Sequence, residues 1–151
     1  METPFRFGLE RVREIRAHDE EQAKEQFAAT LNQRLRGEAV LRAAEERLHE
    51  AQRPVLPESS GGPISGGSLV ARQAWVERLQ RSREDAALRL RGLEAELERK
   101  RASLTDASRR REVLDKLKDR QRDAHRQACE RRESIALDEM ALSVHVRRRA
   151  A

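Results

Sequence analysis

The sequence predicts an all-α fold: a long antiparallel coiled coil of two helices, a helical hairpin, with a C-terminal helical overhang. The 151 residues are 39% charged and 3% aromatic, with one Trp and no Tyr. Such a chain lacks the bulky side chains of a compact core and has the composition of long helices. Apolar residues also recur at alternating steps of three and four, and the helix-breaking residues gather in one place. We therefore expect one coiled-coil domain over residues 1–151.

The first helix is predicted over about residues 5–53, in two apolar groups. One group lies on or near a single face, and the second follows in regular three-four steps. The offset between the groups predicts a stutter near Gly37, which changes supercoiling locally. The first group is Leu9, Val12, Ile15, Ala23, Phe27, Leu31 and Leu35, and the second is Leu41, Ala44, Leu48 and Ala51.

A flexible linker is predicted over residues 54–68. It holds Pro54, Pro57 and Pro63, three of the four prolines, and four of the seven glycines. Proline removes a backbone donor and glycine disfavours helix, so no helix should run through this segment.

The second helix is predicted over about residues 69–146, with Ser68 as its cap. From Leu69 to Leu114, ten of the fourteen positions reached in three-four steps are apolar, which is a heptad pattern over about six repeats. The fourteen are Leu69, Arg72, Val76, Leu79, Arg83, Ala86, Leu90, Leu93, Leu97, Lys100, Leu104, Ala107, Arg111 and Leu114.

The overhang follows from matching the two helices in a hairpin. If Arg53 lies opposite Leu69, then Leu9 lies opposite about Val113, and the heptad pattern ends at Leu114. Residues 115–146 would then continue alone for roughly 45–50 Å. Their end is apolar again, with a basic tail at 147–151, and an apolar stripe left in water suggests a protein partner.

Composition and charge exclude several classes of protein. The 32 basic and 27 acidic residues interleave, giving a net charge of +5, so the block of like charge and the stacking aromatics of a nucleic-acid binder are missing. The single Cys129 forms no internal disulfide. The start of the chain does not resemble a secretory signal and no apolar run is long enough to span a bilayer, so we expect a cytoplasmic protein without direct membrane insertion.

No catalytic, metal, cofactor or small-molecule site is predicted, and we expect no enzyme. His125 and Cys129 share a helix face, but no second pair with ligand spacing accompanies them. No nucleophile and base can be assembled from the scattered His and acidic residues. Trp75 stands beside the heptad position Val76. It either widens the contact between the helices or serves as a binding anchor, a role in which exposed Trp is enriched.

Three short motifs resemble the flagellar FliJ family. The chain opens with Phe5-Arg6-Phe7-x-Leu9-Glu10-x-Val12, its second helix starts with Trp75-Val76-x-x-Leu79, and its end contains Leu137-Asp138-Glu139-Met140-Ala141. The motifs stand in the family's order, and the length and two-helix plan also fit, so the resemblance covers essentially the whole chain.

The resemblance implies a part in the flagellar type III secretion apparatus, and hence in protein transport, flagellum biogenesis and motility. FliJ proteins form a coiled coil similar to the gamma stalk of rotary ATPases, sit in the ring of the export ATPase FliI, contact the export gate FlhA and escort export chaperones. This implies a peripheral place at the cytoplasmic face of the inner membrane. A structural coiled coil or general secretion chaperone that merely bridges protein partners is the alternative.

The resemblance and the predicted overhang together give two groups of candidate contact residues. The first group stands at family positions associated with the gate and comprises Trp75, Leu79, Ser82 and Ala86. The second group, at the end of the overhang, is expected to contact the ATPase ring and comprises Ile135, Asp138, Glu139, Met140, Leu142, Arg147, Arg148 and Arg149.

Overall fold

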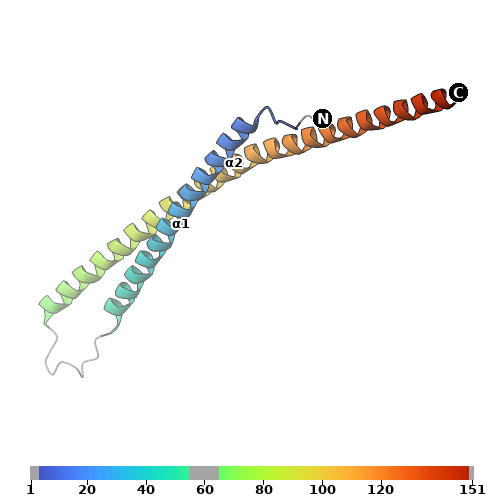
Figure 1. Ribbon diagram of the computed structural model, residues 1–151. Helices are drawn as coiled ribbons and strands as arrows, with labels where there is room; N and C mark the ends of the chain where they lie inside the picture. The colour runs from blue at the N-terminus through green and yellow to red at the C-terminus, as the bar shows by residue number, and fades with distance from the viewer. Residues whose placement is uncertain (1–3, 55–64, 150–151) are drawn as a thin grey trace. The chain divides into compact units, whose positions relative to one another are not determined.

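The computed structural model describes residues 4–54 and 65–149 and contains two long helices within them (Figure 1). Helix α1 spans Glu10–Gln52 and helix α2 spans Gly66–Arg149, and the described residues include no strand. The two helices pack against each other in opposite directions, as a helical hairpin does. The predicted all-α hairpin is thus confirmed. Most of the predicted linker, residues 55–64, lies outside the described residues.

The packing contacts divide the chain into two units, each holding part of both helices. The hinge unit comprises Gln22–Thr105, and the terminal unit comprises the described residues up to Glu21 and from Asp106 onward. We describe each unit by itself. The expectation of one domain over residues 1–151 stays a prediction.

Helix α2 begins three residues before the predicted start because Ser65 caps it. The Ser65 hydroxyl oxygen accepts a hydrogen bond from the backbone N–H of Gly67 at 3.3 Å. The backbone carbonyl of Ser65 accepts one from the N–H of Leu69 at 3.2 Å. This satisfies donors that a helix start otherwise leaves unpaired. The prediction that Ser68 is the cap was wrong, since Ser68 already lies in the first turn and donates its hydroxyl to the Ser65 carbonyl at 2.6 Å.

Helix α1 begins at Glu10, later than the predicted start near residue 5. A turn precedes it, in which the N–H of Glu10 donates to the carbonyl of Phe7 at 3.2 Å. The non-helical segment carries two aromatic side chains that are not left in water. Phe7 is only 8% exposed, and the ring of Phe5 lies 5.8 Å from that of His125 on α2. The segment before α1 is therefore held by its aromatic side chains rather than by a further turn of helix.

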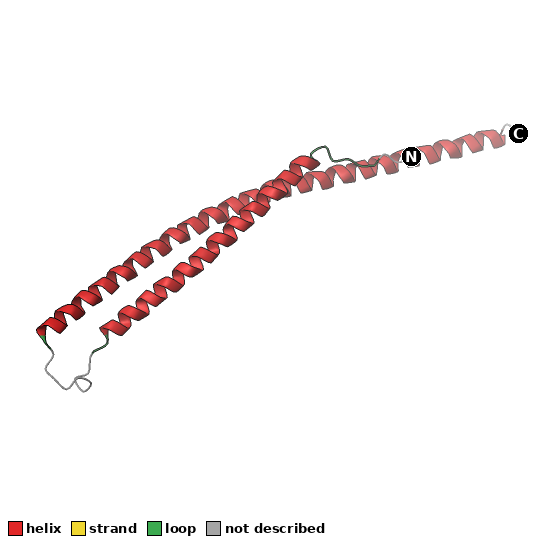
Figure 2. Cartoon of the chain, turned by 60° about the vertical axis from the view of Figure 1, so that its left-hand side comes forward, coloured by secondary structure: helices red, strands yellow, loops and turns green. Residues whose placement is uncertain are grey.

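In the hinge unit the two helices lie side by side (Figures 1 and 2). Many of the side chains buried between them are small or apolar. Ala23, Ala44 and Ala86 are buried, and a Cβ added at Gly37 would lie 3.0 Å from a methyl carbon of Leu93. Small residues thus let the helices approach closely. Twelve of the fourteen predicted heptad positions of α2 are buried or half-buried; the exceptions are Leu69 and Arg83.

Part of the first predicted group on α1 lies off the contact face, whereas Ala23, Phe27 and the whole second group lie on it. The predicted stutter was wrong. Buried and half-buried residues recur in unbroken three-four steps through Gly37, so the spacing contains no inserted residues. Leu9, Val12, Ile15 and Leu35, which were assigned to the contact face, are exposed. The positions that do face α2 are 13, 16, 20, 23, 27, 30, 34, 37, 41, 44, 48 and 51.

Polar residues occupy several positions of the contact face of α1, mostly in its first half. Arg13, Glu20, Thr30 and Arg34 all lie on it, and Thr30 is only 5% exposed. The Thr30 hydroxyl donates to the carbonyl of Gln26 at 2.9 Å, which satisfies the buried oxygen. Apolar spacing alone therefore points to the wrong side of the helix over its first turns.

In the terminal unit α2 stays covered well beyond Leu114, so the predicted point where it continues alone was wrong. The Nζ atom of Lys118 lies 2.8 Å from a carboxylate oxygen of Glu10, and the Phe5 contact extends coverage to His125. All residues from 130 to 149 are exposed. The uncovered part of α2 is thus about 30 Å long by helical rise, shorter than expected.

We expect Gly92→Ala to stabilise the protein by about 1 kcal/mol, the usual difference between Gly and Ala inside a helix. A Cβ at Gly92 meets nothing within 4 Å, whereas one at Gly37 requires Leu93 to move. Gly37→Ala should therefore stabilise less than Gly92→Ala. Urea unfolding of both variants measures the difference, and an equal gain at the two positions would contradict the close approach at Gly37.

The contribution of Glu10 to stability should vanish in acid. Hydrogen bonds from Arg13, and secondly from Lys118, lower the pKa of Glu10 from 4.5 to about 2. A lowered folded-state pKa gives stability that is fully present above pH 4.5 and is lost as the pH falls toward about 2. The difference in melting temperature between the wild type and Glu10→Gln, followed by circular dichroism, should shrink over this window. A difference that stays constant across it would refute the assignment.

Candidate functional site

The first candidate surface is a shallow groove beside Trp75 in the hinge unit. Trp75 and Leu79 line it from α2, and Arg47, Glu50 and Ala51 line it from α1, around a volume of about 500 Å³. Trp75 is 50% exposed, with the guanidinium of Arg78 at 5.7 Å from its ring centroid. The indole therefore contributes to the rim of the groove and still offers half of its surface to a partner.

The four predicted gate-contact residues differ in how accessible they are. Trp75 and Ser82 are exposed and Leu79 is half-buried, whereas Ala86 is 7% exposed and packs in the contact between the helices. The structure thus brings Trp75 and Leu79 together in one groove and leaves Ala86 inside the helix pair. The sequence did not identify Arg47, Glu50 and Ala51 as groove residues, because only the pairing of distant segments brings them beside Trp75.

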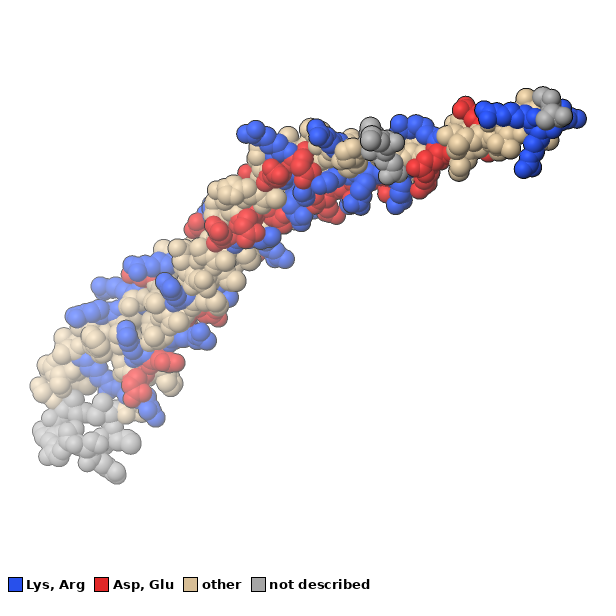
Figure 3. All heavy atoms as spheres, viewed as in Figure 1, with Lys and Arg blue, Asp and Glu red and all other residues tan. Residues whose placement is uncertain are grey.

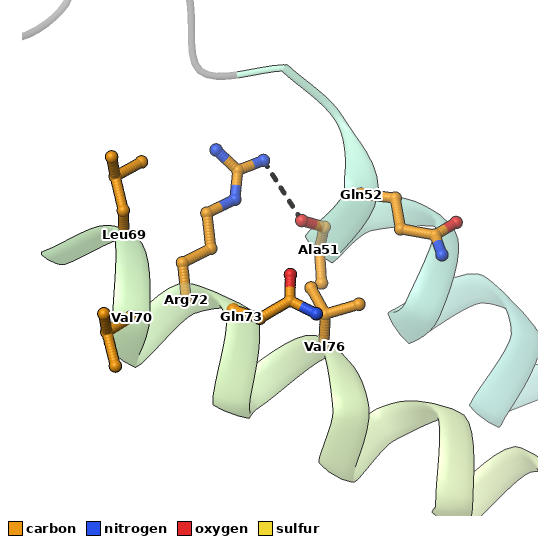
Figure 4. A pocket seen from close by; sticks show the side chains of 7 residues that line it. All are labelled: Ala51, Gln52, Leu69, Val70, Arg72, Gln73 and Val76. Carbon is orange, nitrogen blue, oxygen red and sulfur yellow. Dashed lines mark hydrogen bonds between the residues drawn. The ribbon is translucent and has the colours of Figure 1, made fainter. Parts of the chain in front are cut away.

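A second groove lies at the end of the hinge unit, where α1 stops (Figure 4). It encloses about 590 Å³. Arg72 reaches across it and donates hydrogen bonds to the carbonyls of Arg53 and Ala51, the latter at 3.2 Å. These carbonyls belong to the end of α1, whose last carbonyls lack partners within the helix. Arg72 therefore caps α1 from the other helix, which explains a charged residue at a heptad position. The groove is lined by Ala51, Gln52, Leu69, Val70, Arg72, Gln73 and Val76.

The second candidate surface is the uncovered end of α2 in the terminal unit. Its apolar side chains are between 50% and 64% exposed, which is unusual for so many neighbouring aliphatic residues. They are Ile135, Leu137, Met140, Leu142, Val144 and Val146.

These apolar residues form two stripes on opposite sides of the helix. At about 100° per residue, Ile135 and Val144 point about 180° apart. Ile135, Leu142 and Val146 make one stripe, and Leu137, Met140 and Val144 make the other. We name them the heptad stripe and the opposite stripe, because the first continues the heptad positions of α2.

Charged residues flank the two stripes and end the helix. Asp138 and Glu139 are exposed, with Asp138 between the stripes and Glu139 in the phase of the heptad stripe, and the last turn carries Arg147, Arg148 and Arg149. Figure 3 shows Lys and Arg side chains gathered at this end of α2. Cations there interact favourably with the negative end of the helix dipole. Every predicted ring-contact residue is thus exposed and available to a partner; the set is Ile135, Asp138, Glu139, Met140, Leu142, Arg147, Arg148 and Arg149.

Leu137 and Val144 were missed as candidate contact residues, although their signal is present in the sequence. Together with Met140 they follow the three-four spacing of a helix stripe. The expectation of a single stripe that continues the heptad phase hid the second one.

His125 and Cys129 lie close together on α2. The Sγ atom of Cys129 lies 3.8 Å from Nδ1 of His125, as their shared helix face predicts. Within residues 4–54 and 65–149, no three His, Cys, Asp or Glu side chains are grouped so that they could hold a metal ion. Neither helix in those ranges combines the length and apolarity that spanning a membrane requires.

The fold defines a class of protein: a helical hairpin in which the described end of α2, residues 130–149, is exposed. Comparison with known families identifies it further. The family described as "Flagellar FliJ protein" matches residues 5–150, and the chain belongs to this family. Neither the curated proteins nor the solved structures gave a significant match. Family membership makes the chain a flagellar export-related protein, in a family of structural export components that is not known for catalysis.

Proposed function

We propose that the protein is the central stalk of the flagellar export ATPase: its uncovered end of α2 inserts into the ring of FliI. The observation that carries this proposal is the pair of opposite apolar stripes. A flat surface or a single partner helix covers one side of a helix, whereas a ring opening surrounds it. Burying both stripes removes apolar surface from water at about 25 cal/mol for each Å².

The charged residues of this end give the proposed contact its specificity. Arg147, Arg148 and Arg149 would face acidic groups of the ring, and Asp138 and Glu139 would face basic ones. Complementary charges at the rim of an interface fix orientation more than they raise affinity. The rod can bias the ring only if its contacts differ between the conformational states of the ATPase subunits. In our proposal these differential contacts couple ATP hydrolysis to export.

We further propose that the groove beside Trp75 contacts the export gate FlhA and that the rod escorts export chaperones at the cytoplasmic face of the inner membrane. A half-exposed indole beside an aliphatic side chain is the kind of anchor that dominates binding at protein interfaces. Trp75 and Leu79 carry this part of the proposal. Ser82 can contribute at the edge, and Ala86 supports the surface from within the helix pair.

Replacing either stripe should weaken binding to FliI. One variant changes Ile135, Leu142 and Val146 to Ser, and a second changes Leu137, Met140 and Val144 to Ser. Each should lose about tenfold or more in affinity, because three buried apolar anchors are removed. Calorimetric titration with FliI measures the affinity, and stimulation of ATP hydrolysis should fall in parallel.

Deletion of residues 135–151 tests whether this end of α2 is needed for ATPase stimulation but not for folding of the helix pair. It should abolish stimulation of the ATPase and leave thermal unfolding of the helix pair unchanged, because the described residues in this segment are exposed. If only one of the two triple variants weakens binding, a partner that contacts one side of the helix would be favoured over a surrounding ring. If neither stripe affects ring assembly or hydrolysis, the stalk proposal fails and a bridging coiled coil is favoured.

Trp75→Ala should weaken binding to FlhA with little effect on stability. The indole is half-exposed, so its loss should change the free energy of unfolding by less than about 1 kcal/mol, including the contact with Arg78. Leu88→Ala is the control, since Leu88 is 67% exposed on the same helix and lines neither groove described above. Affinity that is equally reduced by both variants, or by neither, would remove Trp75 from the site.

A further inference from the structure

In the terminal unit, charged side chains of α1 itself form ion pairs with α2. The face of α1 turned toward α2 carries Arg13 and the buried Glu20. Leu9, Val12 and Ile15 lie beside this face with 41%, 40% and 53% of their surface exposed. Burial of apolar surface on α1 itself therefore contributes little to holding this part of the helix on α2.

Six charged residues of alternating sign form a continuous chain of ion pairs between the helices. Lys118 of α2 pairs with Glu10 at 2.8 Å, and Glu10 pairs with Arg13 of its own helix at 2.6 Å. The chain then crosses back from Arg13 to Asp115 at 3.2 Å.

Arg111 completes the chain. It contacts Asp115 one helical turn away at 2.8 Å and crosses to Glu20 on α1. The chain thus passes between the helices three times. We name it the ion-pair clasp, formed by Glu10, Arg13 and Glu20 of α1 and Arg111, Asp115 and Lys118 of α2.

The clasp lies where water and salt can reach most of it. Apart from Glu20, whose side chain is 7% exposed, its side chains are between 30% and 37% exposed. Pairs that are accessible to this extent are screened by dissolved ions, whose Debye length falls from about 10 Å at 0.1 M to about 3 Å at 1 M. Ionic strength therefore acts directly on the contacts that hold this part of α1.

The hinge unit is held by a different force. Its contact face carries Ala23 and Ala44 from α1 and Ala86 and Leu90 from α2, all buried or half-buried. Contacts of this kind depend on removing apolar surface from water, which moderate concentrations of potassium chloride do not screen. The two units should consequently respond differently to the same salt.

We propose that the ion-pair clasp is a salt-sensitive latch: it lets the first turns of α1 open from α2 at raised ionic strength while the hinge unit stays paired. The segment before α1 adds the buried Phe7 and the contact of Phe5 with His125, which do not depend on charge pairs and so should be screened less by salt. This conformational device is independent of the proposed function, because it operates in the isolated chain without any partner.

Hydrogen exchange followed by mass spectrometry on the full chain tests the latch. Between 0.05 M and 1 M potassium chloride, amides of residues 13–21 should exchange about tenfold faster, the combined effect of losing several individually weak pairs. Amides of residues 27–48 should change less than about twofold by the same reasoning. An unstructured peptide in the same buffers corrects for the effect of salt on intrinsic exchange.

Charge variants connect the effect to the clasp. Arg111→Glu alone should open residues 13–21 already at 0.05 M salt, and adding Glu20→Arg should restore their protection. Lys116→Gln is the matched control, because Lys116 pairs with Glu112 on its own helix at 2.8 Å and crosses to nothing in the clasp. Unchanged exchange of residues 13–21 in high salt, or equal acceleration in both units, would overturn the proposal.

Discussion

A helix that pairs with a single other helix can bury only one face, and the architecture of this protein depends on that constraint. Each helix has one neighbour in each unit, so the rest of its circumference remains in water. This is why a chain with 39% charged residues folds without a large apolar core. Of the four buried apolar side chains in the described residues, three are alanines, Ala23, Ala44 and Ala86, and the fourth is Phe7 before α1.

Under the same constraint, a cluster of exposed apolar side chains is a candidate contact surface for a partner. Trp75 and the stripes at the end of α2 keep half or more of their surface exposed, and burial by a protein partner is the role that we propose for them. Membership of the flagellar FliJ family agrees with such a role, since the family is a component of the export machinery. The exposed apolar side chains are therefore the surfaces on which the proposed contacts depend.

Most of α2 was predictable from the sequence, and much of α1 was not. On α2, Leu90, Leu93 and Leu97 stand in a regular heptad pattern, and their spacing alone selects the contact face. On α1, Arg34 rather than Leu35 faces α2. The prediction failed there because it ranked positions by apolarity, while long polar side chains can pack their aliphatic stems and leave their charges near water. The exposed end of α2 was expected, although its second stripe was not.

The sequence by itself determined the two helices, the break between them and the exposed apolar end, because spacing, proline and glycine act locally along the chain. Only the tertiary structure decided which face of the first turns of α1 meets α2. Arg111 and Lys118 stand at positions in the three-four spacing of α2 where an apolar residue would be expected. Their carboxylate partners, Glu20 and Glu10, lie 91 and 108 positions away in the chain. Because the energy of an ion pair depends on distance in space, local periodicity carries no information about such partners.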